Sequence, residues 1–145
     1  MRIRALALSL AAATGCAHHA RPDSFVRLER TACLERCPQY RVTMYAGGDV
    51  EYVGGPDAPP GTTWSKVAAA EVERLMAAVE RIAPWHCEPD RIITDQPQSI
   101  LTVARHGQSR RVVHDHGDPC APRELLELEG AIDRAGGHPQ LIISQ

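Results

Sequence analysis

The sequence is poor in aromatic residues and contains a single lysine, Lys66. Of its 145 residues one is Phe, two are Trp and three are Tyr, so a folded core must be built mainly from Val, Leu, Ile and Ala. Sixteen basic residues stand against 18 acidic ones, for a formal net charge of −2. A nucleic-acid-binding surface needs an excess of positive charge, so the charge balance argues against such a partner. The length and the 43% apolar content predict one globular domain.

Catalytic and phosphate-binding motifs are also missing. The sequence has no Ser-His-Asp nucleophile pattern and no paired catalytic Glu motif. Its two Gly-Gly pairs, at Gly47-Gly48 and Gly54-Gly55, are too short and wrongly placed for a phosphate loop. We therefore expect a protein that is not an enzyme.

The first sixteen residues have the pattern of an export signal. Arg2 and Arg4 form a short positive segment, and residues 5–13 (ALALSLAAA) are apolar but too few to span a bilayer. Residues 13–16 (ATGC) resemble the lipobox of bacterial lipoproteins, in which the Cys is lipidated and the chain is cut before it. The alternative is an ordinary secretory signal that is cut nearby, with Cys16 as a spare thiol.

This pattern predicts the organisation of the chain. We expect a signal peptide over residues 1–15, a tether over residues 16–24 that follows the lipidated Cys16, and a single domain over residues 25–145. Two or three acyl chains such as palmitate would hold the protein at a membrane, because each buried methylene adds about 0.8 kcal/mol. By resemblance to proteobacterial lipoproteins, Ala17 in place of Asp favours the outer membrane, with the domain facing the periplasm.

Four cysteines remain beyond the lipobox, and an even number in an exported domain indicates disulfides. Three pairings are possible, and we favour Cys33–Cys37 within one short loop and Cys87–Cys120 between the end of one helix and the start of the next. Zinc and redox sites are the alternatives. The three residues between Cys33 and Cys37 are more than either motif usually has.

Hydrophobic periodicity predicts the secondary structure. In the first expected strand, Val26, Leu28 and Arg30 share one side and Phe25, Arg27 and Glu29 the other. We expect strands at residues 25–31, 40–46, 50–53, 62–67, 99–105 and 109–114, helices over residues 68–82 and from residues 119–122 to Gly136, and a short last strand at residues 141–143. The order ββββαββα predicts an α+β two-layer sandwich, with an antiparallel sheet of five to six strands and two helices on one face.

Three stretches together resemble a known family. Residues 28–33 (LERTAC) lead through residues 37–40 (CPQY) into a strand, residues 94–97 (TDQP) precede another strand, and residues 114–117 (HDHG) precede a helix bounded by proline. Over about residues 25–135 the chain resembles the bacterial domain of unknown function 6438, found in exported proteins and lipoproteins. The resemblance implies a small single domain in a lipoprotein or periplasmic setting, and it carries over no catalytic residue.

Residues 114–120 (HDHGDPC) form the segment that is richest in possible metal ligands. His114 and His116 lie two apart at a strand end and therefore point the same way. They would share Zn²⁺ or Cu²⁺, with Asp118 or His86 as a third ligand that a Cys87–Cys120 disulfide would bring close. The alternative is that these residues only form a loop, with Asp118 as the N-terminal cap of the last helix.

A second candidate site is the loop with Thr94, Asp95 and Pro97, because loops on a rigid scaffold often carry function. The alternative is an Asx turn at Asp95 that only shapes the chain. Trp64 and Trp85 are interpreted as core or rim packing. Our first hypothesis is a non-enzymatic module that binds an unknown envelope protein or ligand through a sheet edge or the Asp95 loop. The alternative is a metal-binding or thiol-redox accessory protein of the periplasm.

Overall fold

The computed structural model describes residues 23–87 and 95–137. Cys16, the predicted signal peptide, most of the tether, Thr94 and the predicted strand at residues 141–143 lie outside the described residues. The elements are β1 (Phe25–Arg30), β2 (Tyr40–Tyr45), β3 (Asp49–Gly54), β4 (Gly61–Lys66), α1 (Ala69–Ile82), β5 (Gln98–Arg105), β6 (Gln108–Asp115) and α2 (Arg123–Ala135). In the part of the chain that is described, no helix has the length and apolar character needed to cross a membrane.

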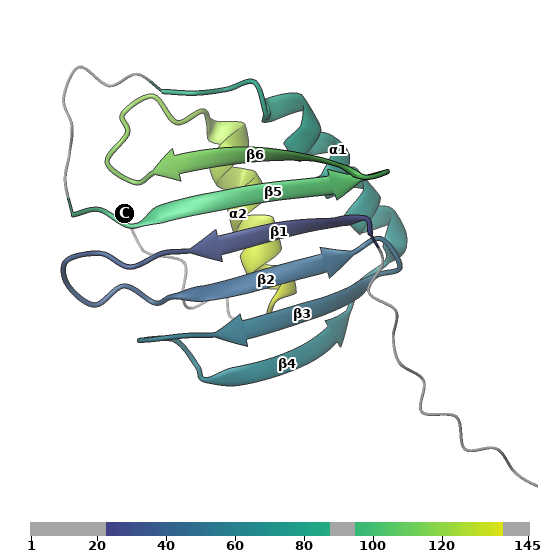
Figure 1. Cartoon of the computed structure of the whole chain (residues 1–145), viewed down its shortest axis with the longest axis horizontal. Coiled ribbons are helices and arrows are strands. Elements are labelled where there is room, and N and C mark those ends of the chain that lie inside the picture. Colours follow the sequence, from purple (N-terminus) through teal and green to yellow (C-terminus); the bar gives the residue numbers. More distant parts are fainter. Residues whose placement is uncertain (1–22, 88–94, 138–145) are drawn as a thin grey trace, which may run out of the picture.

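The six strands form one antiparallel sheet in the order β4-β3-β2-β1-β5-β6, and both helices lie behind it in Figure 1. The predicted α+β class and the order ββββαββα are confirmed. Strands that follow one another without an intervening helix pair with each other, which accounts for most of the order. The exception is β5, which follows α1 and joins the sheet beside β1. Leu28 of β1 consequently has a cross-strand partner on each side, Val42 and Leu101.

Two tight turns set the register of the hairpins. Between β2 and β3, Gly48 has a φ of 92°, a conformation that favours glycine, and its N–H donates to the carbonyl of Tyr45 over 2.8 Å. Between β5 and β6, His106 has a φ of 51° and Gly107 a φ of 75°. Two successive residues with positive φ are typical of the turn that suits a twisted hairpin.

The hydrophobic core lies between the sheet and the two helices. From α1 it takes the stripe that the helical period predicts, and alternate strand residues complete it. Fully or almost fully buried side chains include Val26, Leu28, Val42, Met44, Tyr52, Val72, Leu75, Met76, Val79, Leu101, Val103, Val112, Leu125 and Ile132. Two acidic residues of α2, Glu129 and Asp133, are buried with them at 2% and 1% exposure. The core-facing side of α2 is therefore not entirely apolar, because Glu129 and Asp133 lie on it.

The start of α2 corrects one prediction. Asp118 does not cap the helix, because the residue in the N-cap position is Pro122 and the cap has no side-chain hydrogen bond. The backbone of Pro122 is extended, so the helix begins at Arg123, five residues after Asp118. The N–H of Asp118 donates instead to the carbonyl of Asp115 over 2.9 Å.

Candidate functional site

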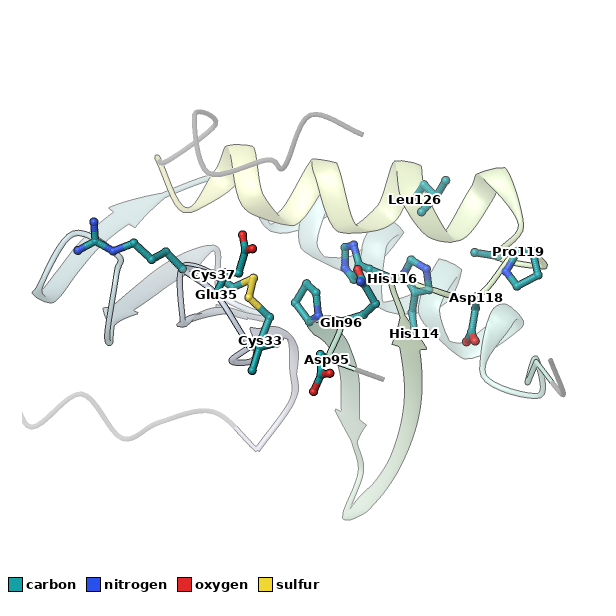
Figure 2. Close-up of a pocket in the computed structure, with 14 residues that line it drawn as sticks. Cys33, Glu35, Cys37, Asp95, Gln96, His114, His116, Asp118, Pro119 and Leu126 are labelled. Atoms are coloured by element: carbon teal, nitrogen blue, oxygen red, sulfur yellow. A yellow bond between two sulfur atoms is a disulfide. The ribbon is translucent and has the colours of Figure 1, made fainter. Parts of the chain in front are cut away.

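A cleft of about 870 Å³ opens at the end of the sheet where β1 and β6 finish and β5 begins (Figure 2). Its lining comes from the loop between Cys33 and Cys37, from residues 95–97, from the end of β6 with His114, His116 and Asp118, and from the start of α2. Asp95 and Pro97 of the predicted binding loop both line it. The structure thus brings two separately predicted sites, the Asp95 loop and the His114 segment, to one cavity.

Backbone hydrogen bonds join the walls of this cleft. The N–H of Leu34 donates to the carbonyl of Asp95 over 3.4 Å, and the N–H of His116 donates to the carbonyl of Pro97 over 3.1 Å. Asp95 itself has a φ of 71°, a conformation that Asp tolerates better than most residues. Three segments that are distant in the sequence are therefore held together independently of their side chains.

Two disulfides stabilise the same region. Cys33 is bonded to Cys37, with Cα atoms 5.6 Å apart, and this bond closes the loop at the rim of the cleft. Cys87 is bonded to Cys120, with Cα atoms 6.1 Å apart, and this bond joins the segment after α1 to the segment before α2. This is the pairing that the spacing favours. A sulfur in a disulfide is not a thiolate, so these four residues as bonded offer zinc no ligand.

Beneath the cleft lies a buried polar network centred on Arg30, the last residue of β1. Its Nη2 donates to Asp133 Oδ2 over 2.6 Å and its Nη1 donates to Glu129 Oε2 over 2.9 Å. Tyr40 donates its hydroxyl proton to the other oxygen of Asp133 over 2.7 Å. Burial would lower the pKa of Arg30, but the charges of Asp133 and Glu129 outweigh it and raise the pKa above its usual value. The guanidinium is thus a permanent cation in the interior.

His116 completes the network from the side of the cleft. Its Nε2 lies 2.9 Å from Arg30 Nη1 and 2.6 Å from Ser99 Oγ, and Arg30 Nη1 also contacts Ser99 Oγ. A guanidinium only donates hydrogen bonds, so this contact favours Nε2 as the acceptor and the tautomer with the imidazole proton on Nδ1. Burial and then the charge of Arg30 lower the pKa of His116 below its usual value, which agrees with a neutral ring.

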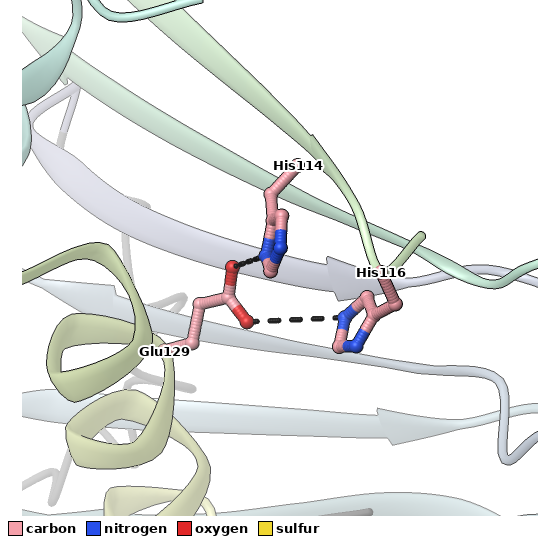
Figure 3. A group of neighbouring side chains, drawn as sticks. All are labelled: His114, His116 and Glu129. Atoms are coloured by element: carbon pink, nitrogen blue, oxygen red, sulfur yellow. Dashed lines mark hydrogen bonds and ion pairs between the residues drawn. The ribbon is translucent and has the colours of Figure 1, made fainter. Parts of the chain in front are cut away.

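His114 is oriented by the carboxylate of Glu129, which also accepts a hydrogen bond from Arg30. Its Nδ1 lies 2.7 Å from Glu129 Oε1, and both side chains are almost completely buried. Figure 3 shows the two groups facing each other. Burial would raise the pKa of Glu129, but the hydrogen bond from His114 and the charge of Arg30 lower it, so Glu129 is ionised. A carboxylate only accepts, so His114 donates from Nδ1, and in the neutral ring its Nε2 carries the lone pair.

The two histidines therefore offer complementary atoms. Their rings are stacked, with centroids 4.7 Å apart, and both line the cleft. Within residues 23–87 and 95–137, neither Nε2 of His114 nor Nδ1 of His116 has a hydrogen-bond partner. A lone-pair acceptor and an N–H donor thus lie side by side. A hydroxyl or an amide group, which both donates and accepts, is complementary to this pair.

The predicted metal site is only partly assembled. His114, His116 and Glu129 each place a possible ligand atom within 4.8 Å of the others. The proposed third ligands do not join this group: Asp118 lines the cleft outside it, and the exposed His86 has its Nδ1 3.4 Å from the carbonyl of Pro84.

The hydrogen bonds around this group also do not suit a cation. Arg30 already donates to Glu129 Oε2 and lies against His116 Nε2, so a metal ion on these atoms would face a guanidinium. The other nitrogen of His116 carries a proton. Only Nε2 of His114 keeps a lone pair that no described residue uses.

Sequence reasoning missed Arg30, Ser99, Glu129 and Asp133 as parts of the site. A signal existed for three of them. Strand alternation places Arg30 on the side of Val26 and Leu28, and helical spacing places Glu129 and Asp133 four residues apart within the apolar stripe of α2. A charged residue predicted on a core-facing side is a sign of a buried ion pair.

The comparison with known families agrees with the resemblance seen in the sequence. The model of a family described as a domain of unknown function (DUF6438) matches residues 24–136, which include every element of the fold and the whole lining of the cleft. No curated protein matches the chain.

Proposed function

The chain belongs to the family of the domain of unknown function DUF6438, and from its site we propose that it is a binding module anchored in the bacterial cell envelope, which holds a ligand or a segment of a partner in the cleft. The observation that carries this proposal is the pair of histidine nitrogens at the base of the cleft. Apart from Arg30 Nε, which is buried without a hydrogen-bond partner among the described residues, the other groups of the network bond to one another, so the histidine pair is the part that faces the cleft and is left to a ligand.

Binding agrees with the geometry better than catalysis does. Ser99 is the one hydroxyl next to a histidine here, but it is 1% exposed, and its oxygen is within 3.0 Å of Glu129 as well as bonded to His116. A nucleophile must reach its substrate, and its base must accept a proton. A protonated His116 would face Arg30. The pair is therefore unsuited to nucleophilic attack.

The rim of the cleft offers a contact for a macromolecular partner. Leu34 is 76% exposed at the tip of the loop that the Cys33–Cys37 disulfide closes. An exposed apolar side chain on a rigid loop loses little conformational freedom when it is covered, which favours binding. Leu34 and the histidine pair together would contact one partner at two points.

Export and anchoring rest on residues 1–16 and on the cysteines. The lipobox resemblance predicts acyl chains on Cys16, and disulfides persist in oxidising compartments such as the periplasm. Intact mass spectrometry of protein purified from its own membranes tests this part. We expect the acyl mass, its loss in Cys16→Ser, and two disulfides. An unlipidated protein that is released by washing would contradict the anchor.

Binding in the cleft is tested by photocrosslinking in cells. A photoreactive amino acid replaces Leu34 in one variant and the exposed Glu127 of α2 in a control. We expect a specific adduct at position 34 that is absent at position 127 and is lost when His114→Phe fills the base of the cleft. The same adducts at both positions, or an adduct that His114→Phe leaves unchanged, would contradict binding in the cleft.

A second candidate function, metal binding, has one observation in its favour, the group of His114, His116 and Glu129. Zn²⁺ or Cu²⁺ would require His116 to lose its Nδ1 proton or Arg30 to move away. The hydrogen bonds described above therefore support the first function over the second.

A further inference from the structure

The second face of the sheet carries a row of aromatic side chains. Both helices lie on one face, and no described element covers the other (Figure 1). On this open face Phe25 of β1 pairs across the strands with Tyr45 of β2, with ring centroids 6.4 Å apart, and Tyr45 stacks on Trp64 of β4 at 6.1 Å and 16°. We call Phe25, Tyr45 and Trp64 the aromatic row. It contains half of the aromatic residues of the chain.

Trp64 is the exposed member of the aromatic row. Trp64 is 52% exposed, whereas Tyr45 beside it is almost completely buried. The sequence-based interpretation of Trp64 as core or rim packing therefore accounts for only one side of its ring. Trp64 continues a row of contacting rings that also includes the half-buried Phe25, and such a contiguous aromatic surface is suited to an apolar contact.

Basic side chains flank the row. The guanidinium of Arg27 lies 4.6 Å from the centre of the Phe25 ring, and Lys66 is largely exposed at the end of β4, where its Nζ lies 2.8 Å from Asp49. Aromatic rings with nearby cations are typical of protein surfaces at the membrane interface, where the ring enters the headgroup layer and the cation meets lipid phosphates.

The position of the aromatic row relative to the N-terminus also fits a surface at the membrane interface. Phe25 is the first residue of β1, so the row lies at the end of the sheet where the chain enters the domain. Eight residues separate Cys16 from Phe25. Fully extended they span at most about 30 Å. A lipidated Cys16 therefore keeps Phe25 within about 30 Å of the bilayer, which lets the row reach the headgroup layer.

We propose that the aromatic row is a membrane-docking surface that rests in the headgroup layer beside the lipid anchor. This inference rests on the proposed lipidation of Cys16. The cleft begins at the other end of β1, beyond Arg30, roughly 17 Å along the strand from Phe25. Docking through the row would therefore leave the cleft outside the docked surface, where a soluble partner reaches it.

The two tryptophans allow a direct test. The full lipidated protein is reconstituted in vesicles of phosphatidylethanolamine and phosphatidylglycerol that carry brominated acyl chains, which quench nearby tryptophan emission. The variant Trp85→Phe reports on Trp64 alone. Its matched control, Trp64→Phe, reports on Trp85, which packs against the core and has its ring 6.3 Å from His114 at the cleft end. Thermal unfolding checks that both variants keep the fold.

We expect Trp64 emission to be lost in brominated vesicles and Trp85 emission to be kept. Bromines near the headgroup end of the chains should quench Trp64 more than bromines near the bilayer centre. Equal quenching of both residues, or none, in protein that carries acyl chains and stays with the vesicles would overturn docking and leave the anchor intact. Crosslinked dimers through Trp64 without quenching would assign the row to a second copy and also overturn it. Protein without acyl chains that leaves the vesicles would instead contradict the proposed anchoring.

Discussion

Arg30 and Asp133 form an ion pair in the interior of the protein, with Nη2 2.6 Å from Oδ2 and side-chain exposures of 9% and 0%. Arg30 ends β1, a central strand of the sheet, and Asp133 lies near the end of α2. The pair thus fixes the helix against the centre of the sheet. Glu129, one turn before Asp133, accepts a hydrogen bond from Arg30 Nη1 and positions His114. The base of the cleft therefore depends on a charge outside its lining.

The first prediction concerns this cation. Arg30→Met should lower the free energy of unfolding by about 3–5 kcal/mol, because it leaves two buried carboxylates without a compensating charge. Urea unfolding measures the change. The control is Arg74→Met, which removes an exposed ion pair with Glu71 and should cost at most about 1 kcal/mol. Similar effects of the two variants would show that the Arg30 network contributes no more than a surface pair.

The second prediction compares the disulfides. Cys87 and Cys120 are 33 residues apart and Cys33 and Cys37 are 4 apart. The loop-closure model gives about 3.8 kcal/mol for the long loop and about 2 kcal/mol for the short one. The double variant Cys87→Ser/Cys120→Ser should therefore unfold at a lower urea concentration than Cys33→Ser/Cys37→Ser. The reverse order would mean that the rim loop contributes more to the fold than its length implies.

The third prediction is a pH dependence of stability. The pKa of His116 is lowered in the folded protein. As the pH falls below about 6.5, the usual histidine value, the unfolded chain binds a proton that the folded protein refuses. The free energy of unfolding should therefore fall between pH 7 and pH 5, by at most about 1.4 kcal/mol per pH unit for this group. Urea unfolding at several pH values measures the slope.

The variant His116→Gln should flatten this slope, because glutamine still accepts a hydrogen bond from Arg30 but does not titrate. The exposed His86 supplies the control, and His86→Gln should keep the slope of the unmodified protein. Glu129, whose pKa is lowered, adds its own loss of stability only below about pH 4.5 and so falls outside the window. An unchanged slope in His116→Gln would assign the effect to another group.

The fourth prediction concerns the protons of the histidine pair. Long-range ¹H–¹⁵N spectra at pH 7.5 should show both His114 and His116 protonated at Nδ1 and unprotonated at Nε2, because Glu129 accepts from the first and Arg30 donates to the second. Addition of Zn²⁺ should leave both rings unchanged. Stoichiometric zinc binding that shifts both rings would contradict these assignments and favour the metal-binding function.

The local features of the fold follow from local patterns in the sequence. Alternation in residues 25–31 places Val26 and Leu28 toward the helices, and glycines at positions 48 and 107 mark the two tight hairpin turns. The position of β5 in the sheet does not follow from a local pattern. It pairs with β1 because α1 crosses behind the sheet, and nothing within residues 98–105 predicts which strand will be its neighbour.

The sequence by itself determined the order of strands and helices and the α+β class, because each depends on patterns within short segments, and among three possible disulfide pairings it favoured the one that the structure contains. Only the tertiary structure decided the cleft. Arg30 meets Glu129 and Asp133 across 99 and 103 residues, and Ser99 meets His116 across 17. Such contacts depend on how the strands pair and on how α2 packs against the sheet. The stability of a buried charge depends on the residues that pair with it. A local sequence pattern can predict that a charged residue is buried, but it does not show which residues pair with it.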